Sequence, residues 1–443
     1  MKKVFTIVAL LISVLCLISV PAFGETLEER LNRLEKEIQD LKAQAAQREA
    51  ELAEIKAAAA KPAPPVVAAP AKPAEGDVWT KYNMRLYGRV KIDLHHDTAQ
   101  FYNNDWVGAV KNVSGYTNDS TNFNPRDTRF GFEASHTDNG WTGLGRFEVD
   151  FYGTNAPGDN GNNLIPRMRL GYVNLIYNPC NTSLLIGQDW VPVAQLNPSQ
   201  IDFSILTASG NLWWRVPQVT VRKQIGDFEL LASAMRHRRT ATTDEARMPW
   251  VLGRVAYNGG LLGKGCSVAL GGGYRTESVA KSTWTTADHR IERYLLAAEL
   301  KLVRGPWEFK AEPWIGQGIG DEFWRYDLSV NYHNGVGDTA DPETIWAWGG
   351  FVDLTYKVDP RLSFTVGYGV DDPRDEDLAG INFNDGNAAR DRQFTMNSQL
   401  FFNTWYQLTK AIKVGAELIH VKTERLSDTN SGNRFTVSTW YEF

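Results

Sequence analysis

The sequence predicts an all-β transmembrane barrel of about sixteen antiparallel strands, preceded by an N-terminal α-helical coiled coil. Three observations predict this fold class. Segments that alternate between apolar and polar side chains recur from Met84 to Phe443, connections of unequal length join them, and a heptad repeat precedes them. Alternation at every second residue places one face of a strand in lipid and the other in water, as the wall of a membrane barrel requires.

Residues 1–24 are expected to be a secretory signal peptide. Lys2 and Lys3 precede a long apolar run, and small residues at Ala22 and Gly24 suit cleavage after that run. The mature protein is therefore expected to be exported.

Residues 25–60 carry a heptad pattern that predicts a coiled coil in the periplasm. Its apolar residues step by four and three, at Leu27, Leu31, Leu34, Ile38, Leu41, Ala45, Leu52 and Ile55, and Arg48 interrupts one core position. No second helical segment supplies a partner, so self-association is favoured over a single amphipathic helix. The heptads alone do not decide between a dimer and a trimer. Residues 61–78 then form an Ala/Pro linker, which is expected to be extended and semi-rigid.

The barrel is expected to span residues 79–443, and its closing segment shows the alternation most clearly. One face carries Phe435, Val437, Thr439, Tyr441 and Phe443, and the other carries Arg434, Thr436, Ser438, Trp440 and Glu442. The same pattern returns in 83–95, 129–135, 141–153, 167–177, 227–237, 293–303, 306–316, 346–356, 361–370, 393–408 and 412–423. No fixed repeat motif marks the blades of a soluble propeller.

The connections between these segments fall into two classes. Short ones lie at 138–140, 178–181, 226–227, 358–360 and 408–410, and long polar ones at 97–125, 154–166, 191–214, 318–341 and 371–391. Short turns on one side and long loops on the other are typical of outer-membrane barrels, with both chain ends on the periplasmic side. Closure is also required, because an open sheet edge in lipid would leave backbone groups without partners.

A barrel of this size would enclose an aqueous channel, and the connection 191–214 is expected to narrow it. This segment is unusually apolar for an exposed loop, with Val191, Val193, Leu196, Ile201, Phe203, Ile205 and Leu206. The apolar side chains of such a loop are expected to be buried, and the lumen of the barrel is the place where they can be. We therefore expect an inward constriction loop.

Candidate pore-lining residues follow from the water-facing positions of the strands. Arg129, Arg146, Arg167 and Arg169 share that phase on three successive strands, and Arg215 follows the loop. Stacked guanidinium groups would attract a passing carboxylate or phosphate. Asp189 and Asp202, both assigned to the loop, could face them and set a transverse field. The alternative is that these charges merely solvate the inner face of a water-filled barrel.

Several short motifs resemble the DcaP-like trimeric porins of Gram-negative bacteria. The resemblance rests on the coil, the linker, GQDW at 187–190, IDF at 201–203, Arg215 with VPQV at 216–219, and GVDDPRDEDL at 369–378. It covers the chain from about residue 25 to its end. It implies a sixteen-stranded homotrimer in the outer membrane, through which small and often anionic solutes such as dicarboxylates diffuse; the trimer is implied by the resemblance alone.

Other functions fit the sequence less well. The 47 basic and 52 acidic residues are nearly balanced, which argues against a nucleic-acid surface. The seven His residues show no catalytic setting, and no metal or cofactor site is expected. After the signal, Cys180 and Cys266 remain; we favour two free thiols over a disulfide, because they lie about four strands apart.

Two alternatives to a diffusion channel remain. In the first, the coil and linker tether the outer membrane to the cell wall, with peptidoglycan as a partner. In the second, the barrel is a sleeve for a redox partner such as a cytochrome. A sleeve needs an unobstructed lumen, so an inward loop argues against it.

Overall fold

The computed structural model describes Gln39 and residues 83–443, apart from 104, 112–118, 154–163, 239–243, 246–247, 280–288, 324, 326–327, 332–341, 379–392 and 427. The chain divides into two compact units, Met1–Ala74 and Glu75–Phe443, and the barrel belongs to the second. Apart from Gln39, the expected signal peptide, coiled coil and linker lie outside the described residues. Within those residues, no helix is long and apolar enough to cross a membrane.

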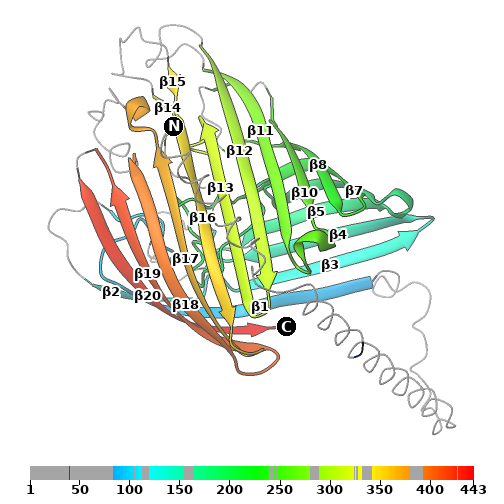
Figure 1. Cartoon of the computed structure of the whole chain (residues 1–443), viewed down its shortest axis with the longest axis horizontal. Helices are drawn as coiled ribbons and strands as arrows, with labels where there is room; N and C mark the ends of the chain where they lie inside the picture. The colour runs from blue at the N-terminus through cyan, green and yellow to red at the C-terminus, as the bar shows by residue number, and fades with distance from the viewer. Residues whose placement is uncertain are drawn as a thin grey trace, which may run out of the picture. The chain divides into compact units, whose positions relative to one another are not determined.

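The described part of the second unit is built almost entirely from β-strands (Figure 1). The strands of the wall are β1 (Asn83–Asp97), β3 (Arg129–Asp138), β4 (Trp141–Asp150), β5 (Arg167–Tyr177), β6 (Thr182–Trp190), β7 (Arg215–Ile225), β8 (Phe228–Met235), β10 (Trp250–Tyr257), β11 (Ser267–Val279), β12 (His289–Arg304), β13 (Trp307–Gln317), β16 (Trp346–Lys357), β17 (Leu362–Pro373), β18 (Met396–Gln407), β19 (Ile412–Glu424) and β20 (Thr429–Glu442).

Four shorter strands complete the described set. They are β2 (Ser120–Asn124), β9 (Asp244–Glu245), β14 (Val330–Asn331) and β15 (Glu343–Thr344). β2 and β3 pair with successive parts of β1, and β9 pairs with β11 beyond the end of β10, so β2 and β9 continue wall positions already occupied. β14 and β15 pair only with each other in the described residues.

The sheet closes on itself through its first and last strands. Each wall strand pairs antiparallel with the next, and β1 pairs with β20 from Arg89↔Glu442 to Asp97↔Arg434. In Figure 1 the C-terminal end of red β20 accordingly lies beside blue β1. The described residues thus form a closed antiparallel barrel of sixteen strands, as the sequence predicted. Closure matters because an unpaired strand edge would be costly in hydrocarbon.

The two faces of the wall differ as the alternation predicted. On β20, Phe435 and Val437 are 47% and 41% exposed, whereas Arg434, Thr436 and Ser438 on the inner face are fully buried. On β1, the outward-facing Ile92 contrasts with buried Lys91, Asp93, His95 and Asp97 in the same way. Because the side-chain period is two, one register sends the apolar side chains of these two strands mainly to the outer face and their charged side chains mainly to the inner face.

The connections sort to the two ends of the barrel. Two to four residues join β3 to β4, β5 to β6, β7 to β8, β12 to β13, β16 to β17 and β18 to β19 at one end. In the first of these turns, Asn139 and Gly140 both have positive φ, which an Asn-Gly pair tolerates and a tight hairpin demands. A nine-residue connection, 258–266, joins β10 to β11 at the same end. The other connections lie at the opposite end and are longer, except for the short β19–β20 connection at 425–428.

Aromatic side chains gather on the outer face near the short turns. Cross-strand pairs there include Trp141 with Tyr177, Phe228 with Tyr257, and Trp307 with Tyr356, whose ring centroids lie 4.7, 5.0 and 4.5 Å apart. Amphipathic rings favour the boundary between hydrocarbon and headgroups, so this band fits one edge of a bilayer.

Both Cys180 and Cys266 are free thiols, the first exposed and the second buried.

Candidate functional site

The connection between β6 and β7, residues 191–214, is described over its full length and is tightly packed. Val193, Leu206 and Leu212 are fully buried. Three N–H···O=C bonds between residues three apart wind the stretch 202–209 into consecutive turns. Within it Ile205 and Ala208 have positive φ, a conformation that such side chains adopt only when the surrounding contacts hold it.

Three carboxylates of the barrel wall hold the backbone of this loop. The contacts run from the N–H of Leu196 to Glu312 of β13 (2.8 Å), from that of Ser199 to Asp353 of β16 (2.7 Å), and from those of Ile201 and Asp202 to the two oxygens of Glu417 of β19 (2.7 and 2.8 Å). None of the three acids is more than 1% exposed. Their charge is therefore covered by the loop.

Side-chain donors of the same wall bind the carbonyl groups of the loop. The hydrogen bonds, with their donor–acceptor distances, run from Lys91 to the carbonyl of Ile201 (2.7 Å), from Lys310 to that of Asn197 (2.6 Å), from Asn403 to that of Ser199 (2.8 Å), from Asn397 to that of Ala208 (2.7 Å) and from Trp314 to that of Gly210 (2.7 Å). Apart from Lys91 of β1, these donors come from β13 and β18, which are far from β6 and β7 in the strand order. The loop therefore crosses from its own strands to the facing part of the wall.

The other part of the wall carries the arginine residues that the sequence singled out. Arg129 on β3 bonds to Asp127 at 2.8 Å and keeps 23% of its side chain exposed. Arg89 and Lys91 of β1 contact the same carboxylate at 2.6 and 3.2 Å. Lys91 also pairs with Asp93 at 3.1 Å. Three cations thus face two carboxylates, which leaves this region with a small excess of positive charge.

Arg167, Arg169 and Arg215 gather around one further carboxylate. Arg167 and Arg169 of β5 each lie 2.7 Å from Asp150, and Arg215 of β7 lies 3.7 Å from it. Arg169 also bonds to Glu148 at 2.5 Å. Arg167 is about a quarter exposed, whereas Arg169 and Arg215 are buried. The structure therefore brings three of the predicted arginines together, with one open to solvent.

Arg146 of β4 stands apart from that group. It bonds to the hydroxyl of Tyr87 at 2.8 Å and lies 4.0 Å from Glu133. Its side chain is 30% exposed. It therefore presents an accessible cation on the strand between Arg129 and Arg167.

The two predicted aspartates occupy different environments. Asp202 is fully buried in the loop and pairs with Arg434 of β20 at 3.1 Å. Burial has the largest single effect and acts to raise the pKa of Asp202. Arg434, His95 and the hydrogen bonds with Ser204 together outweigh burial, so the pKa lies below its ordinary value. Asp189, assigned to the loop from the sequence, instead belongs to the end of β6, because its backbone still pairs with Val216 of β7.

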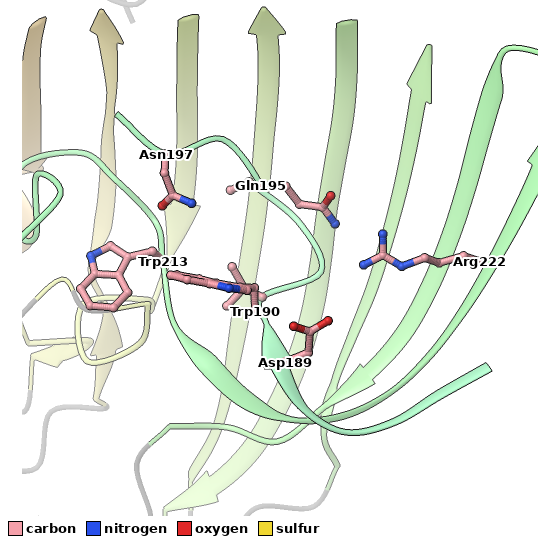
Figure 2. Close-up of a pocket in the computed structure, with 8 residues that line it drawn as sticks. Asp189, Trp190, Gln195, Asn197, Trp213 and Arg222 are labelled. Atoms are coloured by element: carbon pink, nitrogen blue, oxygen red, sulfur yellow. The ribbon is translucent and has the colours of Figure 1, made fainter. Parts of the chain in front are cut away.

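A pocket of about 230 Å³ is lined by the end of β6, by Arg222 of β7 and by residues of the loop (Figure 2). Its polar and aromatic lining comes from Asp189, Trp190, Gln195, Asn197, Trp213 and Arg222. Figure 2 shows the guanidinium of Arg222 and the amide of Gln195 pointing toward each other, with the carboxylate of Asp189 beside them. The pocket therefore presents both signs of charge next to flat indole rings.

Two features of this site were not predicted from the sequence, namely Arg222 and the three wall carboxylates that bind the loop. Arg222 sits on the water-facing side of β7, a phase that the alternation of this strand could have revealed. The wall carboxylates Glu312, Asp353 and Glu417 also occupy inward phases of their strands. No sequence signal could show that these three acids bind the loop, since that depends on the path of the loop across the barrel.

Comparisons with known proteins show where this fold occurs. No family model and no curated protein sequence matches the chain. Among solved structures, the chain is similar to the outer membrane channel DcaP of Acinetobacter baumannii, with 22% identity and a TM-score of 0.69 over 82% of this chain and 97% of that one. OmpF of Salmonella typhi, solved with daunomycin, has 15% identity and a TM-score of 0.51 over 82% and 98%.

An outer membrane protein of Vibrio cholerae, OmpT, is also similar. It has 13% identity and a TM-score of 0.51 over 82% of this chain and 98% of that one. OmpT has in addition been solved in a trimer form. At these identities the likeness establishes the shared barrel fold.

Proposed function

We propose that this protein is an outer-membrane porin, a water-filled channel for the passive diffusion of small polar solutes with a preference for anions. In this role it carries out no enzymatic reaction and needs no cofactor. The likeness of its barrel to the outer membrane channel DcaP supports the proposal at the level of the fold.

One observation carries the preference for anions. The acids Glu312, Asp353 and Glu417 are covered by the loop 191–214. By contrast, Arg129 and Arg146 on the other part of the wall keep about a quarter of their side chains exposed. On this part of the wall the partly exposed Arg129, Arg146 and Arg167 stand against the partly exposed Glu133. This excess of accessible cations favours carboxylates and phosphates.

We further propose that the loop 191–214 narrows the pore. Its hydrogen bonds to wall residues of β13, β16, β18 and β19 support a path across the lumen. This path disfavours a sleeve for a redox protein, which needs a wide lumen.

We also propose a homotrimer held in part by a periplasmic coil of residues 25–60; the trimer form of the similarly folded OmpT supports it.

Planar-bilayer recording in a salt gradient tests the function. We expect closures in three steps and a reversal potential set by anions. Replacing Arg129, Arg146 and Arg167 with Gln should move the reversal potential toward that of a non-selective pore, whereas Arg361→Gln in an exposed turn should leave it unchanged. A wild-type reversal potential set by cations would refute the anion preference, and the lack of any conductance would refute the channel itself.

A further inference from the structure

The pocket between β6, β7 and the start of the loop has two opposite charges that the protein leaves available. Asp189 makes no ion pair among the described residues. Among the described residues, Arg222 forms one ion pair, with Glu229 at 3.7 Å, and keeps 30% of its side chain exposed. A distance of 3.7 Å with that exposure is a weak interaction, so a bound solute could compete for the guanidinium.

The aromatic side of the pocket is held rigidly. Arg215 and Arg169 lie over the ring of Trp190 at 5.2 and 5.7 Å, and Trp213 lies 6.1 Å from it. The indole N–H of Trp213 donates to Thr207 at 2.9 Å. Since the partners of these rings are themselves buried or bonded, the rings are positioned before any solute arrives.

Amide groups add directional contacts. Gln195 donates one hydrogen bond to the carbonyl of Pro192 at 2.9 Å, which orients its side chain and leaves its oxygen free to accept. Figure 2 shows this amide facing Arg222 across the pocket. Asn197 lies on the same wall, and its oxygen accepts a bond from Asn211 at 3.4 Å. Its amide N–H groups remain as donors.

We propose that this pocket is a solute-binding subsite for small zwitterions that carry a flat apolar group, the chemistry of an α-amino acid. The carboxylate of the solute pairs with Arg222, its ammonium group pairs with Asp189, and its apolar part lies against Trp190. A plain dicarboxylate fits less well because Asp189 repels its second charge. This inference rests on the proposed channel function and adds a class of solute that the arginine wall alone would not select.

The test compares three solutes of nearly equal size that differ in charge: L-phenylalanine, 3-phenylpropanoate and phenethylammonium. In wild-type channels in a planar bilayer, we expect L-phenylalanine to block the current most often at equal concentration. Each missing charge should lower the apparent affinity about two- to fivefold, the range of a partly exposed ion pair. Equal blocking by all three, or strongest blocking by 3-phenylpropanoate, would overturn the subsite.

Variants identify the two charges. Asp189→Asn should abolish the advantage of L-phenylalanine over 3-phenylpropanoate, and Arg222→Gln should abolish its advantage over phenethylammonium. Glu133→Gln, a partly exposed acid of β3 outside the pocket, should change neither ratio. If the pocket binds no solute, the two ratios of apparent affinity should be the same in the wild type and in all three variants.

The failure of the channel and the failure of the subsite give different results. A conducting protein without solute discrimination retains the channel and overturns the subsite. Where no conductance is found, equilibrium dialysis of radiolabelled L-phenylalanine against the folded protein in detergent, with 3-phenylpropanoate as competitor, still reports on the subsite. Binding that 3-phenylpropanoate displaces as well as unlabelled L-phenylalanine would overturn it there too.

Discussion

At the scale of single residues, Asp202 connects three distant parts of the chain. Its carboxylate pairs with Arg434 on the last strand and accepts the N–H of Val107 at 3.1 Å. It also accepts the N–H of Ser204 at 2.8 Å, within its own loop. A fully buried carboxylate with this many donors is well satisfied, and removing its charge would leave Arg434 with Asp97 as its remaining carboxylate partner.

We expect Asp202→Asn to destabilise the barrel by about 3 kcal/mol, the lower end of the cost of breaking a buried ion pair. Equilibrium unfolding by urea in lipid vesicles measures this change. Asp138→Asn, at the exposed end of β3, is the matched control and should change stability by less than about 0.5 kcal/mol. A loss of the same size in both variants would show that the pair with Arg434 contributes little.

The pH dependence of this contribution follows from the lowered pKa of Asp202. A carboxylate whose pKa is lower in the folded state stabilises the fold above its unfolded pKa of about 3.9, and loses that contribution as the pH falls through the folded value. The difference in stability between the wild type and Asp202→Asn should therefore stay constant from pH 7 to pH 5. It should shrink below about pH 4. A difference that already vanishes at pH 6 would contradict this assignment.

At the scale of elements, the loop 191–214 and the wall meet backbone to backbone. A Cβ atom on Gly369 of β17 would overlap the carbonyl oxygen of Ser209, and one on Gly210 would overlap the carbonyl oxygen of Gly350. Gly210 in addition has a φ of 98°. Glycine at these points lets the loop approach the wall more closely than any side chain would allow.

We expect Gly369→Ala to push the loop away from the wall at a cost of about 1–3 kcal/mol, as overpacking does elsewhere. The displaced loop should alter the single-channel conductance and increase the current noise. Gly143→Ala on β4 is the control, because a Cβ atom there meets nothing within 4 Å. Unchanged conductance and noise in Gly369→Ala would mean that the loop does not narrow the pore at this point.

At the scale of the whole molecule, the barrel reverses the usual distribution of polarity. Large apolar side chains such as Leu296 and Ile225, 50% and 53% exposed, lie on the outside. The inside holds ion pairs such as Arg254 with Glu299 at 2.8 Å. This arrangement is stable only where hydrocarbon replaces water around the outer face.

The depth of a residue in that hydrocarbon should decide the cost of a charge on the outer face. Leu296 lies near the middle of β12, and Ile225 lies beside a short turn at the end of β7. We expect Leu296→Arg to cost about 2–4 kcal/mol and Ile225→Arg about 0–1 kcal/mol in lipid-vesicle unfolding. Equal costs at the two positions would argue against a bilayer centred on the barrel wall.

Much of the fold could be predicted because its signal is local. In a strand such as β20, the alternation of residues like Phe435 and Arg434 is enough to tell the outer face from the inner one, without knowledge of the neighbouring strands. The same phase located Arg129, Arg146 and Arg167 on the inner face, where the structure has them partly exposed. The partners of these residues could not be predicted in the same way.

The sequence by itself determined the all-β barrel class, the inward phase of the arginine residues and the apolar character of the segment 191–214, because each depends on residues close together in the chain. Only the tertiary structure decided that Asp202 pairs with Arg434, 232 residues away, and that Glu417 binds the backbone of the loop. Only it placed Arg222 beside Asp189 and Gln195 in one pocket. The physical reason is that closure of the sheet and the crossing of the loop join segments that share no local pattern.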